Sequence, residues 1–167
     1  MKKINWGIVG LGHIANQFAN AFSIVDNAKI KGIASFDKDK LQSFKKRFNI
    51  EDKLCFDNYK DLILSPSIDI IYIALPNSLH AKYISECINQ KKNILVEKPA
   101  FIDLKNLSFL KGKLQKEKIF FTEAFMYRYL PYFKKVKEII ERNSLGKIVD
   151  INSTFSTKVY KQKKFLV

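Results

Sequence analysis

Three small residues near the start of the chain have the spacing of a dinucleotide-binding turn. Gly10, Gly12 and Ala15 fit the pattern G-x-G-x-x-G/A and follow a short apolar run. The first glycine of this pattern permits a tight turn, the second lets the backbone approach a pyrophosphate, and the small third residue lets a helix pack closely on the strand. The N–H groups at the positive end of that helix would bind the pyrophosphate. The turn contributes three further predicted cofactor contacts: Leu11, His13 and Ile14.

Lys98 is the first candidate for acid–base chemistry. It directly follows an apolar segment, residues 93–96, and lies between Glu97 and Pro99. A lysine held near a nicotinamide ring could donate a hydrogen bond or a proton to the oxygen of a carbonyl or hydroxyl group. The alternative is an ordinary solvated lysine, one of many in this chain. Its place after a strand favours the chemical role, because ligands of parallel sheets bind at the carboxyl ends of the strands.

Two polar residues follow another apolar segment, residues 68–75, which stops at Pro76. Asn77 has two compatible roles, as N-cap of the next helix or as a contact with the cofactor. His80 lies one helical turn further and is either a structural histidine or a site residue. His13 is expected beside phosphate rather than as a base. Neither histidine has cysteine or carboxylate partners at ligand spacing, so no metal site is predicted.

The rest of the pattern predicts the elements that position these residues. Short apolar runs alternate with stretches whose apolar residues recur at helical spacing. Strands are expected at residues 4–9, 28–35, 54–56, 68–75, 93–96 and 118–122. Helices are expected at residues 14–25, 37–48, 58–64, after 76, from about 103, and from 131 to about 143. This alternation predicts an α/β fold with a doubly wound parallel sheet of the Rossmann type.

Right-handed crossovers place the carboxyl ends of all these strands along one edge of the sheet. Asp37 is a plausible N-cap of the helix after the second strand. Val25 on the first helix, and Leu104 and Leu107 on the helix that starts near residue 103, are expected to face the core. The edge is expected to collect the site residues Gly10, Ser35, Leu75, Asn77, Glu97, Lys98 and the pair Glu123 and Ala124.

Residues 1–122 form the predicted dinucleotide-binding domain. From Lys147 the alternation of strands and helices gives way to apolar residues at every second position, from Ile151 to Val159. That pattern is typical of a half-exposed strand in a second, mostly antiparallel sheet. Residues 123–167 are therefore predicted to be a linker helix and the first strand of a second, α+β open-sheet domain.

Composition and charge argue against a nucleic-acid-binding protein and against a membrane-spanning one. The chain has 167 residues, of which 47% are hydrophobic, and a formal net charge of +14. Its lysines are spread along every predicted helix and loop, which favours a solvated basic surface over a nucleic-acid-binding patch. No apolar run approaches the roughly 20 residues of a membrane span, and the start lacks an apolar signal core, so a cytoplasmic location is expected. Cys55 and Cys87 are expected to be reduced structural thiols.

Four segments, in this order, resemble the Gfo/Idh/MocA oxidoreductases. They are residues 7–15 (GIVGLGHIA), 75–80 (LPNSLH), 97–99 (EKP) and 123–131 (EAFMYRYLP). The last resembles the dihydrodiol dehydrogenase-like branch in particular. The resemblance implies that Lys98 is the catalytic residue, and that Glu97 and Asn77 contact the ribose or nicotinamide of the cofactor.

Arg128 lies in the last of these segments, which in the family links the cofactor domain to the substrate side. Its planar guanidinium group could position an anionic or hydroxylated substrate. The alternative is an interdomain salt bridge with Glu123 or Asp150. Lys98 and Arg128 are the predicted substrate contacts.

The choice between NAD and NADP stays open at this point. An NAD-specific acidic residue is expected about 20 residues past the glycines, where this chain has Ser35, Phe36 and Asp37. Asp37 is either a ribose ligand or the cap of the next helix. Many relatives that prefer NADP have an arginine where Phe36 stands. A phenylalanine cannot pair with a 2′-phosphate, although Ser35, Lys38 or Lys40 could.

The sequence therefore predicts an NAD- or NADP-dependent oxidoreductase that transfers a hydride between nicotinamide and a sugar, polyol or dihydrodiol-like substrate. Family members carry a second domain that completes the catalytic set and the substrate pocket. This chain holds only the beginning of such a domain, so we expect a truncated form of a longer protein. The alternative is a catalytically inactive nucleotide-binding module from a truncated gene. A homo-oligomer through the second-domain sheet is expected if that sheet is complete.

Overall fold

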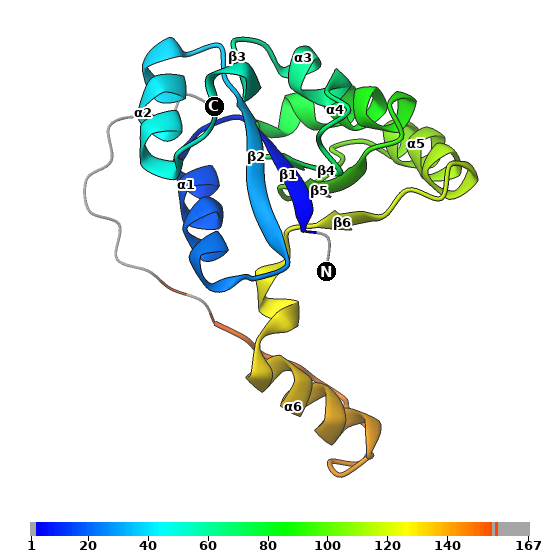
Figure 1. The fold of residues 1–167 in the computed structure, drawn as a ribbon. Helices are drawn as coiled ribbons and strands as arrows, with labels where there is room; N and C mark the ends of the chain where they lie inside the picture. The colour runs from blue at the N-terminus through cyan, green and yellow to red at the C-terminus, as the bar shows by residue number, and fades with distance from the viewer. Residues whose placement is uncertain (1–2, 155, 157–167) are drawn as a thin grey trace. The chain divides into compact units, whose positions relative to one another are not determined.

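The computed structural model describes residues 3–154 and 156, and its core is a six-stranded parallel sheet (Figure 1). The strands lie in the order β3-β2-β1-β4-β5-β6. Their bounds are β1 Ile4–Val9, β2 Ala28–Ala34, β3 Cys55–Phe56, β4 Ile70–Ile73, β5 Asn93–Val96 and β6 Phe121–Glu123. The order reverses between β1 and β4, which places a topological switch point at their carboxyl ends. The predicted doubly wound Rossmann sheet is confirmed.

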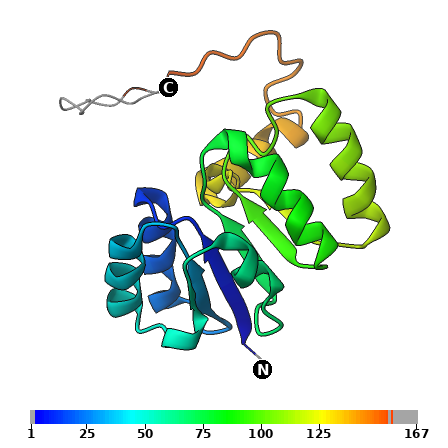
Figure 2. The ribbon, with the colours of Figure 1, turned by 90° about the horizontal axis from the view of Figure 1, so that it is seen from above.

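Helices cover both faces of this sheet. They are α1 His13–Asn20, α2 Lys38–Phe48, α3 Tyr59–Leu64, α4 Asn77–Asn89 and α5 Leu104–Lys116, with 3-10 turns η1 Ala21–Ile24 and η2 Asp52–Leu54. Helices α1 and α2 pack on one face, and α3, α4 and α5 pack on the other (Figures 1 and 2). Each face has its own hydrophobic cluster. Strand β4 contributes to both clusters because all four of its residues are buried.

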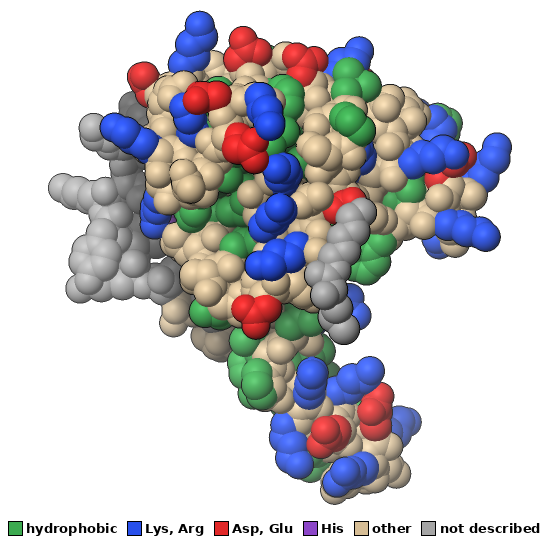
Figure 3. All heavy atoms as spheres, viewed as in Figure 1, with side chains coloured by type: hydrophobic (Ala, Val, Ile, Leu, Met, Phe, Trp, Pro, Cys, Tyr) green, Lys and Arg blue, Asp and Glu red, His purple; other side chains and the backbone are tan. Residues whose placement is uncertain are grey.

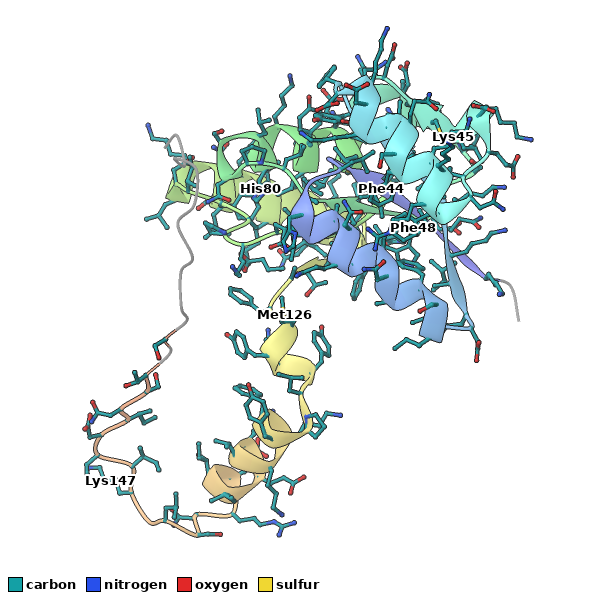
Figure 4. The ribbon with its side chains drawn as sticks, turned by 90° about the vertical axis from the view of Figure 1, so that its left-hand side faces the viewer. Phe44, Lys45, Phe48, His80, Met126 and Lys147 are labelled. Carbon is teal, nitrogen blue, oxygen red and sulfur yellow. The ribbon has the colours of Figure 1, made fainter. Side chains whose placement is uncertain are left out.

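Side-chain caps fix the starts of three helices. Asp37 accepts a hydrogen bond from Lys40 N–H at 3.0 Å at the start of α2, as the sequence predicted. Asn58 and Asp103 cap α3 and α5 in the same way. These caps satisfy N–H groups that have no partner within the helix. Farther along α2, the rings of Phe44 and Phe48 (Figure 4) are 4.5 Å apart and anchor that helix to the cluster on its face of the sheet.

The first helix is shorter than predicted. Helix α1 ends at Asn20, and the chain continues as the 3-10 turn η1 rather than as one helix to Val25. A 3-10 turn has fewer residues per turn than an α-helix, which changes the direction of the side chains that follow. Phe22 packs edge-on against Trp6, with 5.8 Å between ring centroids, whereas Val25 is exposed.

The prediction that Leu104 and Leu107 face the core is wrong. Both side chains are exposed, and Leu110 and Leu114 form the buried face of α5. Only the second half of this helix lies against the sheet cluster, so the apolar residues of its first turn have nothing to pack against in the described chain.

Two strands are shorter than their apolar runs. Strand β4 covers Ile70–Ile73, although the run extends over residues 68–75. Strand β6 begins at Phe121 rather than at Lys118. Lys118 adopts a left-handed backbone conformation, with φ 53°, and this residue turns the chain out of α5 before the strand can start.

The chain divides into two compact units, the first ending at Phe125 and the second beginning at Met126. The second unit contains the 3-10 turn η3 Met126–Tyr129 and α6 Pro131–Glu141. The strand predicted from Lys147 is wrong for residues 147–154, which contain no strand. A strand is stable only when its backbone groups pair with a neighbour, and the described part of this unit offers none. The rest of that prediction lies outside the described residues, with Phe155, Thr157 and Val159.

Candidate nucleotide-binding edge of the sheet

The residues that follow the strands lie in one row at the carboxyl edge of the sheet. Gly10 N–H donates to Ala34 O at 3.1 Å, which extends the pairing of β1 with β2 by one residue. Glu97 N–H donates to Ile73 O at 3.0 Å and does the same for β5 and β4. The edge therefore brings together the predicted site residues that follow β1, β2, β4 and β5: Gly10, Ser35, Leu75, Asn77, Glu97 and Lys98.

The glycine turn, residues 10–12, contains two glycines that are needed for different reasons. Gly10 has φ 88°, and a Cβ atom placed on it would lie 2.5 Å from Ala74 O. The fold itself therefore requires glycine at this position. A Cβ atom on Gly12 would meet no described atom within 4 Å. The space beside Gly12 is available to a ligand, as a pyrophosphate-binding turn requires.

The two helices that flank the switch point begin without a side-chain cap. Helix α1 starts after Gly12 and α4 starts after Pro76, and neither residue provides a capping hydrogen bond. Helices α2 and α5, which also start at this edge, both have aspartate caps. Free N–H groups at a helix N-terminus attract an anion. Asn77 is the first residue of α4 and not its cap, so the capping role considered for Asn77 is wrong.

The other predicted contacts around the glycine turn differ in exposure. Leu11 is buried in the core, so it can offer a ligand only its backbone. Ile14 is half-buried. His13 is exposed, and its Nε2 atom lies 3.0 Å from the side-chain nitrogen of Gln17. Of these three side chains, the imidazole of His13 is the one with polar atoms at the surface.

Asp37, which follows β2, is the N-cap of helix α2. Its carboxylate accepts the Lys40 N–H and also pairs with Lys40 Nζ at 3.0 Å. The hydrogen bonds from the backbone and side chain of Lys40 hold the pKa of Asp37 below its ordinary value. Ser35 is buried, and its hydroxyl oxygen accepts Asp37 N–H at 3.1 Å. Of the two roles considered for Asp37, the helix cap is the one the geometry confirms.

The loop after β5 contains the predicted catalytic lysine, and we call residues 97–100 the Lys98 loop. At its start, Tyr72 on β4 donates its hydroxyl to Glu97 Oε1 at 2.6 Å. At its end, the N–H of the last loop residue donates to Glu123 Oε1 at 2.8 Å. Side chains from the two neighbouring strands therefore hold the loop on both sides of the lysine. The peptide bond between the second and third loop residues is cis.

His80 on α4 has no exposed surface and joins two loops (Figure 4). Its Nδ1 atom is 2.8 Å from Pro99 O, and its Nε2 atom is 2.8 Å from Leu75 O. A carbonyl oxygen can only accept, so each ring nitrogen that carries a proton donates to the carbonyl oxygen it faces. The ring connects the loop after β4 to the Lys98 loop. Both of its nitrogens are engaged by the backbone, which leaves neither for a cofactor.

Lys98 and Arg128 both have exposed side chains. No ion pair or hydrogen bond involves the Lys98 side chain among the residues that the structure describes. Its ammonium group is therefore available to a ligand. Arg128 lies on η3 in the second unit. Glu123, considered above as a salt-bridge partner of Arg128, accepts its hydrogen bond from the Lys98 loop.

Tyr72 holds the site but is absent from the residues predicted for it, and Glu123 was predicted at the sheet edge without a role in holding the Lys98 loop. Tyr72 lies in an apolar run that indicates only a buried strand. A buried tyrosine hydroxyl needs a hydrogen-bond partner, which is a usable signal. The partner itself, Glu97, is 25 residues away in sequence, so only the folded chain identifies it. From the segment that contains Glu123, residues 123–131, the sequence predicted Arg128 as a site residue.

Comparison with known proteins gives the family of the chain. Residues 4–125 match the profile described as "Oxidoreductase family, NAD-binding Rossmann fold". The chain belongs to the Gfo/Idh/MocA oxidoreductase family. The resemblance found in the sequence is thereby confirmed. The matched residues of this Gfo/Idh/MocA chain include the glycine turn, the Lys98 loop and Tyr72.

Curated relatives are similar over nearly the whole chain. A trans-1,2-dihydrobenzene-1,2-diol dehydrogenase from Xenopus tropicalis is 28% identical over 158 residues, which is 93% of this chain and 47% of the relative. A glucose-6-phosphate 3-dehydrogenase from Bacillus subtilis (strain 168) is 32% identical over 166 residues, which is 99% of this chain and 45% of the relative. The chain thus spans about half the length of the curated relatives it matches.

Solved structures of other oxidoreductases agree on the fold. A scyllo-inositol dehydrogenase from Lactobacillus casei, with bound NAD(H) and scyllo-inositol, has a TM-score of 0.80 and 24% identity over 87% of this chain and 43% of its own. A variant of a 3-ketoreductase from Actinomadura kijaniata, in complex with TDP-benzene and NADP, has a TM-score of 0.79 and 26% identity over 88% of this chain and 46% of its own. Proteins with this fold have therefore been solved with NAD(H) and with NADP bound.

The surface of the sheet domain carries mixed charge. Figure 3 shows Lys and Arg side chains spread over the visible face, with Asp and Glu side chains between them. No helix within residues 3–154 is both long enough and apolar enough to cross a membrane. Within the same residues, no three His, Cys, Asp or Glu side chains are grouped so that they could hold one metal ion.

Proposed function

We propose that this chain binds NAD or NADP and is the cofactor-binding part of an oxidoreductase. The reaction would transfer a hydride between nicotinamide and a sugar, polyol or dihydrodiol-like substrate. One observation carries the proposal: α1 and α4 begin without caps on either side of the switch point, with open space at Gly12 between strand and helix. A dinucleotide pyrophosphate fits this arrangement, because it is an anion that must approach the backbone closely.

The nicotinamide dinucleotide, when bound, supplies or accepts the hydride. The residues present fit such a ligand in two places. The N–H groups at the start of α1 would bind the pyrophosphate, beside which His13 is exposed. Glu97 would offer a carboxylate oxygen to a donor on the nicotinamide riboside. Membership of an NAD-binding oxidoreductase family supports both assignments.

The proposal covers both NAD and NADP. Asp37 caps α2 with its carboxylate, and Lys40 is paired with that carboxylate. A 2′-phosphate would be repelled by Asp37 and attracted by Lys40 and Lys38, so the two effects oppose each other at this exposed position. The ratio of the two affinities is therefore a quantity to be measured.

Lys98 is the proposed catalytic residue. It would donate a hydrogen bond or a proton to the oxygen of the reacting carbonyl or hydroxyl group. Its exposed ammonium group and its tied loop support this role, because a general acid must reach the substrate from a fixed backbone. Arg128 is the proposed second substrate contact.

The substrate class is proposed from the relatives. The curated relatives include the dihydrodiol dehydrogenase and the glucose-6-phosphate 3-dehydrogenase described above, and a myo-inositol 2-dehydrogenase from Thermotoga maritima. All three names describe dehydrogenases of hydroxylated carbon compounds. We extend that class to this chain and leave the individual substrate to the assay.

Fluorescence titration with NADH and NADPH tests the binding step. We expect saturable binding of at least one of the two nucleotides, with an affinity that depends on the pyrophosphate. Competition by ADP is the check on that dependence. Failure of both nucleotides to bind would contradict the proposal.

Turnover on a panel of sugars, polyols and diols tests the catalytic step. We expect Lys98→Met to lower kcat about 100-fold or more, as loss of a general acid does, with little change in NADH affinity. Lys111→Met, at an exposed lysine of α5, is the matched control and should be neutral. Wild-type protein that binds NADH without turning over any of these substrates would instead support the inactive nucleotide-binding module.

A further inference from the structure

The side chain of Tyr72 makes one hydrogen bond among the described residues, and its partner lies at the edge of the sheet that carries the site. The residue is on β4, is 1% exposed, and donates its hydroxyl to Glu97 Oε1 at 2.6 Å. In the strand register Tyr72 lies beside Leu95 of β5. Side chains two residues apart on a strand point to the same face, so Glu97 lies on the face of the sheet that carries Tyr72.

The ring of Tyr72 packs against helix α1. The centroid of the Phe18 ring on α1 lies 4.2 Å from that of Tyr72. Phe18 in turn packs against Trp6 of β1 at 5.3 Å. Helix α1 begins at the glycine turn, and Glu97 begins the Lys98 loop. Tyr72 therefore links the two halves of the candidate site through one packed ring and one hydrogen bond.

The direction of this hydrogen bond is fixed. Burial, and secondly the hydrogen bond to the Glu97 carboxylate, raise the pKa of Tyr72 well above its ordinary value. The phenol therefore keeps its proton in neutral and mildly alkaline solution, and the carboxylate accepts. The second oxygen of Glu97 makes no hydrogen bond or ion pair among the described residues, and the side chain is half-buried. A carboxylate with one oxygen occupied still has acceptor capacity on the other.

We propose that Tyr72 is a positioning residue for the nucleotide: by holding one carboxylate oxygen of Glu97, it presents the other to a hydrogen-bond donor on the nicotinamide riboside half of the cofactor. The donor is a ribose hydroxyl or the carboxamide N–H. This inference rests on the proposed function. It adds that the Glu97 side chain is ordered before the ligand arrives, so binding does not have to order it.

Tyr72→Phe tests the inference, because it removes only the hydroxyl oxygen and keeps the ring against Phe18. The affinities of the full chain for NADH and for ADP are measured by calorimetry, together with urea denaturation. ADP carries the pyrophosphate but lacks the nicotinamide riboside. We expect about tenfold weaker binding of NADH, as for a lost hydrogen bond to a charged group, and an ADP affinity within about twofold of wild type.

Two further variants separate positioning from general stability. Tyr83→Phe changes another buried tyrosine, on α4, and should leave both affinities unchanged. Glu97→Ala should weaken NADH and not ADP. When both changes at positions 72 and 97 are combined, the second should add less than about twofold, because the two residues act through one contact.

The outcomes are distinct. Equal weakening of NADH and ADP by Tyr72→Phe would assign the tyrosine a merely structural role and overturn the inference. Unchanged NADH affinity in Tyr72→Phe would also overturn it, and in both cases the proposed function stands. If Tyr72→Phe does not fold, Glu97→Ala decides, and unchanged NADH affinity in that variant overturns the inference. Wild-type protein that binds neither nucleotide overturns the inference together with the proposed function.

Discussion

The glycine turn and the Lys98 loop lie at the same edge of one sheet and are built in opposite ways. The glycine turn owes its shape to missing side chains, since Gly10 has φ 88° and no room for a Cβ atom. The Lys98 loop owes its shape to side chains on three other elements, which are Tyr72 on β4, His80 on α4 and Glu123 on β6. The glycine turn depends on the absence of a side chain at Gly10, and the Lys98 loop depends on hydrogen bonds from side chains of other elements.

The difference fits the role that is proposed for each loop. An anion bound by backbone N–H groups needs a bare turn and a helix start without competing side chains. A reactive lysine needs a backbone that stays in place while its own side chain remains free. Steric changes should therefore damage the glycine turn most, and loss of a polar partner should damage the Lys98 loop most.

Gly10→Ala is the strongest way to break the glycine turn. Strain at φ 88° and overlap with Ala74 O should lower the free energy of unfolding by about 2–5 kcal/mol. Urea denaturation, followed by the fluorescence of the single tryptophan, Trp6, measures the change. Gly112→Ala in α5 is the matched control, because its Cβ atom would meet nothing and it should stabilise by up to about 1 kcal/mol. Similar effects at both positions would contradict the steric account.

His80→Leu is the corresponding change at the Lys98 loop. It removes the ring nitrogens that contact Leu75 O and Pro99 O without removing much volume, and should lower the free energy of unfolding by about 1–3 kcal/mol. The same denaturation experiment measures it. His13→Leu, at the exposed histidine, should change stability by less than about 0.5 kcal/mol. Equal stability of the two variants would show that the bridge between the loops contributes nothing.

Gly12→Ala should have the smallest effect on stability of these substitutions. It separates the structural role of Gly10 from the proposed binding role of Gly12. The added Cβ atom meets no described atom, so the free energy of unfolding should change by less than about 1 kcal/mol. A methyl group in the space proposed for the pyrophosphate should nevertheless weaken NADH binding about tenfold or more. Calorimetric titration measures that loss. Unchanged NADH affinity would mean that the pyrophosphate lies elsewhere.

The order of strands and helices could be predicted because each depends on a local pattern. The apolar run that contains β4 and the Asp37 cap of α2 are visible without any knowledge of the tertiary structure. Predictions about which side chains are covered were less successful. Leu104 and Leu107 continue the apolar stripe of α5 but have no element over them, and the sequence of a helix does not show where its partner ends.

The candidate site also contains features that a local sequence pattern predicts and features that depend on the folded chain. The glycine turn was predicted from the spacing of three small residues, and the sheet edge brings it together with Lys98 as expected. The two roles of Asn77 were compatible and those of Asp37 were alternatives, since a cap and a ligand contact need the same residue types. The structure excludes Asn77 as a helix cap and confirms Asp37 as one, and the contact of Asn77 with a cofactor stays a prediction.

The sequence by itself determined the parallel sheet, the glycine turn and the position of Lys98 at a strand end, because these depend on periodicity, on φ at one residue and on chain order. Only the tertiary structure decided how the Lys98 loop is held. Its ties to Tyr72, His80 and Glu123 join residues 25, 19 and 23 positions apart. Such contacts arise when strands and helices pack, and no local pattern encodes which buried polar groups will meet.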